Sequence, residues 1–569
     1  MIHKPSFDKK MTDGPVILLQ SMTSTSTMDV DETVAQVKRI VDAGADMVRI
    51  STQNRQEVNQ LQIIKKVLQE QSYHIPLIAD THYNADIAEV AATVVEKVRI
   101  NPGNYIDKKQ SRVQWSDEEY QQDLSYIKDR LKALVAICKK HHTSIRVGVN
   151  HGSLSDRIVY KYGNTVEGMV ESAMEFIHIF KELAFTDLVI SLKASNVLLM
   201  VESNRMLYQR MRDEDGEFPL HLGVTEAGDA EDGRIKSAIG IGVLLAQGIG
   251  NTIRVSLTEE PEKEIPVCRK IVTAARENPL GKWADQQWFE RRKTVAVGII
   301  GGGQLPVVIQ NIGDRDIKDA GADFYYKKES AVLMSAFGQM KIESCHRDMI
   351  IEGALNKEKN YFVTLNSSSY TKTILEAIKL YPQTILIIEK EEATGIKGVQ
   401  QLIREVVAAE LNNPLILRLK IEAADEEAFL VQASVQAGAF LLEAQLDGLW
   451  LESEAYKTTE TAFGILQASR QRMSKTEYIA CPSCGRTLFN IQQKLQEIKA
   501  LTESYKGLKI AVMGCMVNGL GEMADADYGY VGSAKGSVDI YKGHELIKNK
   551  VDENIATREL INLIELYEK

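Results

Sequence analysis

Three of the six cysteines lie close together near the end of the 569-residue chain. Cys481 and Cys484 form the pair in CPSC, and Cys515 follows in GCMVNGLGE after 30 further residues. The pair can present two thiolates from one turn to one metal centre, but no fourth cysteine or nearby histidine completes a zinc site. Glu522, seven residues after Cys515, offers a carboxylate instead. Three thiolates and one carboxylate suit an iron–sulfur cluster with one exchangeable iron; structural zinc and a redox CxxC pair remain alternatives.

A second set of chemical groups recurs at the ends of short apolar runs in the first half of the chain. Strand interiors disfavour charge, so each cation there needs a reason. A polyanion such as a diphosphate supplies one; buried ion pairs with Asp80, Asp187 or Glu226 are the alternative. Glu226 is the best candidate for a general acid beside a bound anion. The set comprises Arg49, Arg99, Arg146 with Asn150, Lys193, Thr225 with Glu226, and Arg254 with Ser256.

The elements that must position these groups form a repeating pattern. Stretches with helical periodicity separate most of the apolar runs, as expected for a (β/α)8 barrel whose active site forms at the carboxyl ends of the strands. An open doubly wound sheet competes, but no GxGxxG loop follows the first strand. The eight expected strands are 16–20, 46–51, 76–80, 97–101, 145–150, 187–193, 219–224 and 252–257.

The remainder of the chain predicts two further α/β domains. A charged seam at 278–293 contains Pro and Gly, and strand-like runs resume at 294–300, 323–328, 361–366, 384–390, 414–420 and 448–453. This block is expected to be mainly structural, and a second, incomplete barrel is one arrangement that fits the pattern. We therefore expect a barrel over 1–277, an inserted domain over 278–465 and a small α/β domain with the cysteines over 466–569.

Composition excludes several classes of protein. With 44% hydrophobic and 26% charged residues, the chain is not disordered, collagenous or a coiled coil. A net charge of −10 argues against a general nucleic-acid binder, and six cysteines are too few for a disulfide framework. The N-terminus MIHKPSFDKK has no apolar signal, and no apolar run reaches the ~18 residues of a membrane span. We expect a cytoplasmic protein without membrane partners.

The motifs resemble those of the IspG/GcpE family, the 4-hydroxy-3-methylbut-2-en-1-yl diphosphate synthases, in their long three-domain form. The similar segments include PVILLQSMTSTST, VRINPGN, IRVGVNHGSLSDR, HLGVTEAG, CPSCGR and GCMVNGLGE. The resemblance implies a 4Fe–4S cluster held by Cys481, Cys484, Cys515 and Glu522. It also implies that Thr225 and Glu226 lie beside the reacting carbon and that Asn518 belongs to a loop near the cluster. The implied diphosphate ligands are Arg49, Arg99, Arg146, Lys193, Arg254 and Ser256.

The implied reaction is the reductive ring opening of 2-C-methyl-D-erythritol 2,4-cyclodiphosphate to 4-hydroxy-3-methylbut-2-enyl diphosphate, with loss of water. The sequence has no pyridine-nucleotide motif, so we expect electrons from flavodoxin or ferredoxin. The barrel and the cysteines must meet in space, which predicts domain closure and a homodimer. The alternatives are a pterin- or phosphate-binding barrel transferase with structural zinc, and a scaffold whose cluster only reports redox state.

Overall fold

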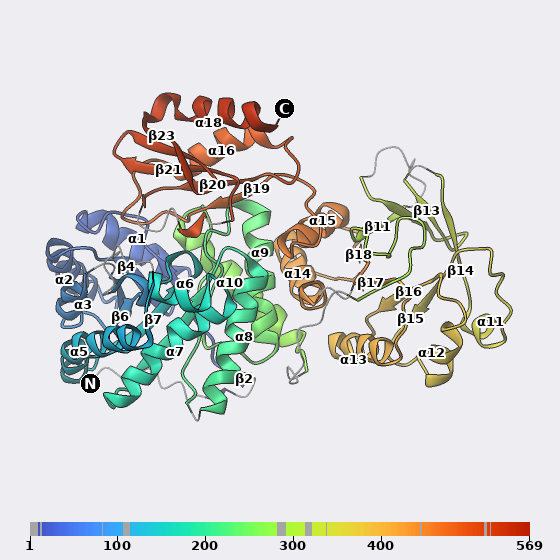
Figure 1. Cartoon of the computed structure of the whole chain (residues 1–569), viewed down its shortest axis with the longest axis horizontal. Helices are drawn as coiled ribbons and strands as arrows, with labels where there is room; N and C mark the ends of the chain where they lie inside the picture. Colours follow the sequence, from blue (N-terminus) through green and yellow to red (C-terminus); the bar gives the residue numbers. More distant parts are fainter. Residues whose placement is uncertain are drawn as a thin grey trace. The chain divides into compact units, whose positions relative to one another are not determined.

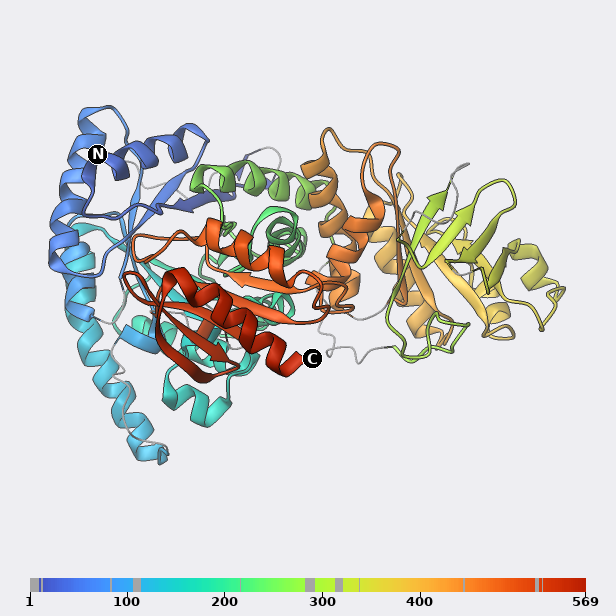
Figure 2. The same cartoon turned by 90° about the horizontal axis from the view of Figure 1, so that it is seen from above.

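The protein is described by a computed structural model, shown in Figures 1 and 2. The structure describes residues 10–568 except 12–13, 82–83, 106–113, 215, 282–291, 313–320, 337, 444–445, 517–520 and 524. The chain divides into two compact units. The first comprises Met1–Leu244, Ile249–Arg269 and Lys475–Lys569; the second comprises Leu245–Gly248 and Lys270–Ser474. The predicted barrel and the cysteine-bearing domain therefore belong to the same unit.

The first unit begins with a short hairpin, β1 (Lys10–Met11) and β2 (Gly14–Pro15), and continues as the predicted (β/α)8 barrel. Its strands are parallel neighbours in the order β8-β7-β6-β5-β4-β3-β10-β9, and an isolated parallel bridge between Ile190 and Leu220 connects the two ends. All eight predicted strands are present, because parallel strands buried on both faces are continuous apolar runs. The strands are β3 (Leu18–Met22), β4 (Met47–Ser51), β5 (Leu77–Asp80), β6 (Lys97–Ile100), β7 (Ser144–Asn150), β8 (Leu188–Lys193), β9 (His221–Leu222) and β10 (Thr252–Ile253).

Helices surround this barrel and begin at side-chain caps. The Asp29 carboxylate accepts from the Glu32 N–H at the start of the first helix, and Ser116 and Glu119 form a capping box on the longest one. None of the described helices is long and apolar enough to cross a membrane. The helices are α1 (Val30–Asp42), α2 (Arg55–Glu70), α3 (Ala85–Ala91), α4 (Pro102–Tyr105), α5 (Asp117–His141), η1 (His151–Ser153), α6 (Asp156–Tyr162), α7 (Val166–Glu182), α8 (Val197–Asp213), α9 (Ala230–Ala246), η2 (Pro261–Lys263) and α10 (Glu264–Glu277).

The cysteine-bearing domain is a five-stranded mixed sheet with helices on one face. The strands are β19 (Glu477–Ala480), β20 (Lys509–Met513), β21 (Tyr528–Ala534), β22 (Ser537–Lys542) and β23 (Glu545–Asp552), in that order. Leu495 of α16 (Ile491–Thr502) and Leu560 of α18 (Glu553–Glu568) share a core with Ile510 and Val512. The other face buries Ile479, Met513 and Met523. Figures 1 and 2 show this domain lying over the barrel, with α18 on its outer side.

The second unit is built on a closed eight-stranded barrel, not an incomplete one. Its third strand runs antiparallel to both neighbours. The strands are β11 (Val307–Ile312), β12 (Phe324–Lys327), β13 (Val332–Ser335), β14 (Lys341–Ser344), β15 (Tyr361–Leu365), β16 (Thr384–Glu389), β17 (Leu415–Lys420) and β18 (Gly448–Glu452). The helices are α11 (Arg347–Ile351), α12 (Lys372–Ile378), α13 (Gly395–Ala408), α14 (Glu426–Leu442) and α15 (Thr458–Ala468).

One predicted strand of this unit is wrong. Residues 294–300 form a turn in which Val297 pairs with Ile300, because Gly298 adopts φ +63° and reverses the chain between them. The strand that opens the barrel is β11, which starts at Val307.

Candidate active site

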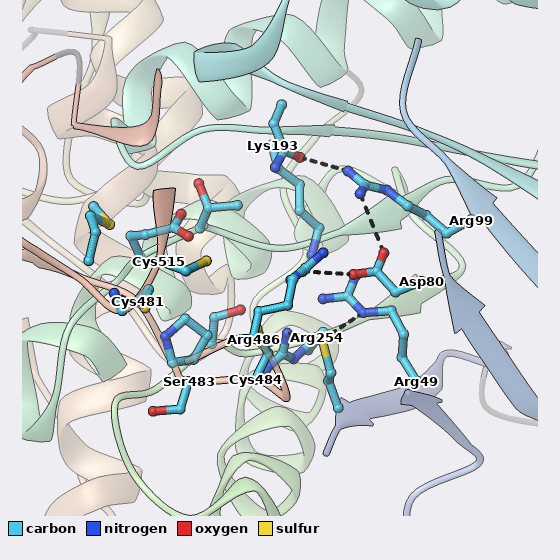
Figure 3. A pocket seen from close by; sticks show the side chains of 18 of the residues that line it. Arg49, Asp80, Arg99, Lys193, Arg254, Cys481, Ser483, Cys484, Arg486 and Cys515 are labelled. Atoms are coloured by element: carbon cyan, nitrogen blue, oxygen red, sulfur yellow. Dashed lines mark hydrogen bonds and ion pairs between the residues drawn. The ribbon is translucent and has the colours of Figure 1, made fainter. Parts of the chain in front are cut away.

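A pocket lies between the carboxyl ends of the first barrel's strands and the cysteine-bearing domain (Figure 3). It holds about 760 Å³ of empty volume, part of it open solvent. The predicted cations line it, together with Asn150, Thr225, Glu226 and Ser256. Figure 3 shows Cys481 and Cys515 on one side, Arg49 and Arg99 on the other, and Cys484, Arg254 and Arg486 close together between them.

Strand register explains why the cations converge. Arg99 lies opposite Asp80 on one neighbouring strand and opposite Arg146 on the other. Residues paired in this way project to the same side of the sheet, which here is the inside of the barrel. Arg99 is 3% and Arg146 2% exposed. Burying several like charges so closely is unfavourable unless other groups compensate them.

Two of the cations have carboxylate partners. Arg254 donates from Nε and Nη2 to the two oxygens of Glu264, at 3.1 and 3.0 Å. Burial opposes the charge of Arg254, but this ion pair raises its pKa above the ordinary value. Arg99 donates from Nη1 to Asp80 at 3.3 Å and from Nη2 to the Gly148 carbonyl at 2.9 Å. The ion-pair alternative therefore holds for Arg99 with Asp80, whereas Arg254 pairs with Glu264, which was not among the expected partners.

Three other cations are not compensated in this way. Burial and the neighbouring arginines lower the pKa of Arg146 and of Lys193 well below their ordinary values. The Nε and Nη1 atoms of Arg146 have no hydrogen-bond partner among the described residues. Burial also lowers the pKa of Arg49, to about 10, and its Nε donates only to the Met22 thioether. A bound polyanion would raise the lowered pKa values of all three side chains, because it brings negative charge to the centre of this group of cations.

Glycines make room for two of these side chains. A Cβ at Gly148 would lie 2.5 Å from Nε of Arg99, and a Cβ at Gly223 would lie 2.7 Å from Nζ of Lys193. Both distances are shorter than real Cβ contacts, so any larger residue would displace the cation.

The carboxyl groups of Glu226 and Glu522 meet at the side of the pocket. Glu522 accepts from Asn150 Nδ2 at 2.7 Å and from Thr225 Oγ1 at 3.0 Å, and is in hydrogen-bond contact with Glu226. Burial raises the pKa of both acids, and the adjacent Glu226 raises that of Glu522 further. Glu226 also adopts φ +48°, a left-handed conformation. Such a pair retains a proton that can be donated to a ligand.

The three clustered cysteines differ from the other three. Cys138, Cys268 and Cys345 are buried in the cores, as bystanders should be. Cys481 accepts a hydrogen bond from the Gly514 N–H at 3.3 Å. Burial raises the pKa of Cys484, but the guanidinium of Arg486 outweighs it and brings the pKa below its ordinary value. Within the described ranges, no three His, Cys, Asp or Glu side chains gather closely enough to hold a single metal ion.

The structure thus brings together almost all the residues expected from the sequence. Asn518 lies outside the described residues. Three further participants were missed as site residues: Asp80 and Glu264, which neutralise arginines, and Arg486, which enters the pocket from the other domain. Arg486 lies within the CPSCGR motif, so the motif was a signal for it.

Comparison with known proteins agrees with this geometry. Residues 8–269 match the GcpE TIM-barrel domain, and residues 477–566 match the GcpE protein C-terminal domain. The chain is 43% identical to the 4-hydroxy-3-methylbut-2-en-1-yl diphosphate synthase (flavodoxin) of Bacteroides thetaiotaomicron, over 96% of this chain and 94% of that protein. It is 35% identical to the chloroplastic, ferredoxin-type synthase of Oryza sativa subsp. japonica, over 97% of this chain and 85% of that protein. The chain therefore belongs to the GcpE family of 4-hydroxy-3-methylbut-2-en-1-yl diphosphate synthases.

Proposed function

We propose that this chain catalyses the two-electron reductive ring opening of 2-C-methyl-D-erythritol 2,4-cyclodiphosphate to 4-hydroxy-3-methylbut-2-enyl diphosphate, a step of non-mevalonate isoprenoid biosynthesis. The observation that supports this best is a single pocket lined by buried cations, by Glu226 and by three cysteines. An anionic substrate, a proton donor and a one-electron centre are the three requirements of this reaction. Family membership and full-length similarity to named synthases agree with it.

A 4Fe–4S cluster fits the three cysteines that line this pocket together with the carboxyl group of Glu522, which contacts Glu226. Cys481, Cys484 and Cys515 would be its thiolate ligands, and Glu522 its oxygen ligand. When bound, the cluster supplies single electrons and a Lewis-acidic iron.

The chain's own residues bind and orient the substrate. The side chains of Arg49, Arg99, Arg146, Lys193 and Arg254 neutralise the diphosphate, and their burial strengthens the attraction. Ser256, 3% exposed, adds a hydroxyl donor to this group. Asn150 and Thr225 orient the Glu522 carboxyl group.

Glu226 then serves as the proton donor to the departing hydroxyl. Its pKa is raised by burial, so the carboxyl group holds a proton where an exposed glutamate would have lost it.

The electron donor is a flavodoxin or a ferredoxin. The similar protein of Bacteroides thetaiotaomicron carries flavodoxin in its name and the rice protein ferredoxin. We also predict that the protein is a homodimer. Light scattering measures the molar mass of the holoprotein and tests this prediction.

Anaerobic purification and turnover test the proposed function. We expect a brown protein with about four irons per chain that converts the cyclodiphosphate when a reduced viologen supplies electrons. A colourless protein that holds only zinc and gives no product would refute the proposal. A protein with the cluster but without turnover would support the scaffold alternative instead.

A further inference from the structure

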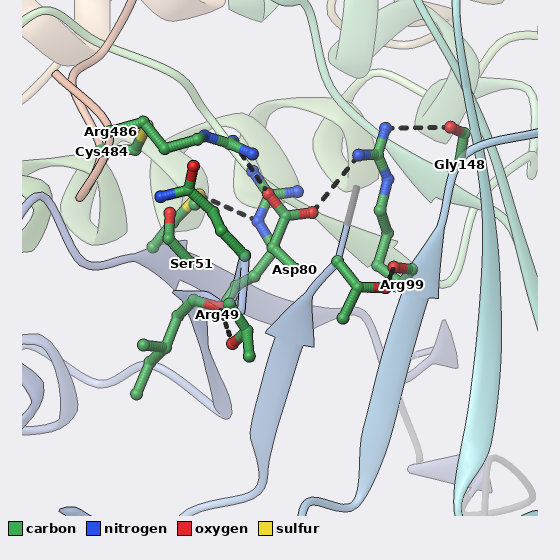
Figure 4. Close-up of polar contacts among 12 residues, drawn as sticks. Arg49, Ser51, Asp80, Arg99, Gly148, Cys484 and Arg486 are labelled. Carbon is green, nitrogen blue, oxygen red and sulfur yellow. Dashed lines mark hydrogen bonds and ion pairs between the residues drawn. The ribbon is translucent and has the colours of Figure 1, made fainter. Parts of the chain in front are cut away.

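Arg486 is a cation of the substrate pocket that comes from the cysteine-bearing domain. It follows Cys484 by two residues, yet its guanidinium reaches the barrel and donates from Nη2 to Asp80 Oδ2 at 3.2 Å (Figure 4). Its side chain is 8% exposed and lines the same pocket as Arg49, Arg99 and Arg254. Five of the pocket's cations belong to the barrel, and this sixth one belongs to the other domain.

The guanidinium of Arg486 has N–H donors that its contact with Asp80 does not use. Besides Asp80, the side chain contacts the Cys484 thiol, whereas the Nε and Nη1 atoms are buried and have no hydrogen-bond partner of standard geometry among the described residues. Buried donors of a charged group are costly when left unsatisfied, and nearly all such groups in proteins have a partner. Because Arg486 lines the pocket, an anion bound there is within reach of these donors, and a guanidinium matches phosphate oxygens in a two-pronged geometry.

Asp80 holds this arginine beside a barrel arginine. Its Oδ2 accepts from Arg486, and its Oδ1 accepts from Nη1 of Arg99 at 3.3 Å, as Figure 4 shows. The carboxylate is 2% exposed, so one buried anion spaces two guanidinium groups from different domains. Both are thereby fixed at the same side of the pocket.

The loop that carries Arg486 also fits tightly against the barrel. A Cβ at Gly485 would lie 2.8 Å from the Thr25 carbonyl, so only glycine allows this approach. On the other side, Thr258 donates from Oγ1 to the Cys481 carbonyl at 3.2 Å. The position of this loop and the position of the Arg486 guanidinium are therefore linked.

We propose that Arg486 binds the anionic group of the substrate from the cysteine-bearing domain, beside Arg99, and thereby couples anion binding to the position of the Cys481–Arg486 loop. The inference rests on the proposed function, in which the pocket takes a diphosphate. A ligand held only by the five barrel cations would leave the loop unaffected. A ligand held also by Arg486 holds the loop against the barrel.

The test uses inorganic diphosphate and the anaerobic holoprotein, with binding measured by calorimetry and backbone amide exchange measured over residues 481–487. For the wild type we expect binding together with slower exchange in this loop. For Arg486→Gln we expect binding at least about tenfold weaker, since a charge-assisted contact is lost, and no slowing of loop exchange. Arg234→Gln is the matched control, because Arg234 pairs with Glu259 and does not line the pocket.

The outcomes separate the two claims. If the wild type does not bind diphosphate, both the proposed function and this inference fail. If Arg486→Gln binds as tightly as the wild type, or if its loop is protected to the same extent, only this inference is overturned. If Arg486→Gln loses its iron, the affinity for diphosphate is measured in Arg486→Lys, which keeps the positive charge but lacks the paired N–H donors of the guanidinium. Binding several-fold weaker than in the wild type supports the role of Arg486, and unchanged affinity refutes it.

Discussion

At the scale of single residues, the pocket contains both cations and acids whose charged forms are disfavoured by their surroundings. Arg146 and Lys193 are cations whose pKa values are lowered by burial and by like-charged neighbours. Glu226 and Glu522 are acids whose pKa values are raised by burial, and the contact with Glu226 raises the pKa of Glu522 further. Each shift disfavours the charged form in the free protein, and an anionic substrate acts on the two kinds in different ways. Bound anion stabilises the cations and leaves a protonated acid available.

Replacement of Glu226 by Gln tests the proton donor. Turnover should fall by about 100-fold or more, because an amide cannot supply the proton, whereas iron content and the visible spectrum stay unchanged. Glu202→Gln is the control: burial raises the pKa of Glu202 to about 7, but this residue lies on α8 and does not line the pocket. Near-normal turnover of Glu226→Gln would mean that another group is the acid.

The lowered pKa of Lys193 predicts that the protein takes up protons when it binds an anion. Its pKa in the free protein lies well below 10.5, so the amine is partly neutral at alkaline pH. A bound anion raises this pKa towards the ordinary value, so uptake is largest at pH values between the lowered pKa and 10.5. Calorimetry with inorganic diphosphate in buffers of different ionisation enthalpy measures the uptake. It should shrink in Lys193→Met, and uptake equal to that of the wild type would assign the proton to another group.

At the scale of elements, Gly152 and Gly521 mark one of the places where the two domains of the first unit meet backbone to backbone. A Cβ at Gly152, in η1, would lie 2.0 Å from the Gly521 carbonyl carbon, and one at Gly521 would lie 1.4 Å from the Gly152 oxygen. No side chain fits there. This contact lies next to Glu522, whose carboxyl group binds Asn150 and Thr225 of the barrel. The closed site therefore requires both glycines.

Gly152→Ala should hold the domains apart. We expect turnover to drop by about tenfold or more, since small displacements of reacting groups are costly, while iron content stays normal. Gly321→Ala is the control, because a Cβ at Gly321 would meet no atom within 4 Å. Activity of Gly152→Ala equal to that of this control would show that the site forms without the close contact.

A buried ion pair attaches α9 of the barrel to β19 of the cysteine-bearing domain. Nζ of Lys236 lies 2.9 Å from Oε1 of Glu477, and the two side chains are 6% and 4% exposed. Lys236→Met leaves the Glu477 carboxylate buried without this partner, which should cost about 3–5 kcal/mol of unfolding free energy in urea titrations. The double variant Lys236→Met with Glu477→Leu should recover most of this loss. Equal stability of the single variant and the wild type would contradict a role for the pair.

The arrangement of the elements explains which features of the site and the fold the sequence could predict and which it could not. The strand-end cations were predicted correctly because a barrel brings all its strand ends to one mouth, whatever its loops do. The Glu264 partner of Arg254 was missed because it comes from α10, not from a strand. The CPSCGR motif contains Arg486, but its place in the pocket was missed because that place depends on how two domains meet. The false strand at 294–300 arose because β-branched composition does not reveal the left-handed turn at Gly298.

At the scale of the whole molecule, the polypeptide leaves the first barrel, builds a second closed barrel and then returns to the first. Segments far apart in sequence, Met1–Leu244 and Lys475–Lys569, thereby form one compact unit. The expected boundary at 465/466 falls inside α15, Thr458–Ala468, whereas the compact units divide after Ser474. The strand ends of the first barrel and the cysteines that line the pocket both come from this compact unit.

This arrangement predicts that each chain completes its own active site, even within a homodimer. Glu226→Gln disables the barrel side of the site, and Cys515→Ser disables the cysteine side. When the two variants are coexpressed, every chain carries one defect, so a site built within one chain stays inactive. If each site were instead built from both chains of a symmetric dimer, about half of the randomly paired dimers would contain one chain of each variant. In each mixed dimer, one of the two sites would carry neither substitution, so about a quarter of all sites would be intact. We expect turnover no higher than that of either variant alone, measured with a reduced viologen on the copurified proteins. Recovery to about a quarter of wild-type activity would place the barrel and its cysteines on different chains.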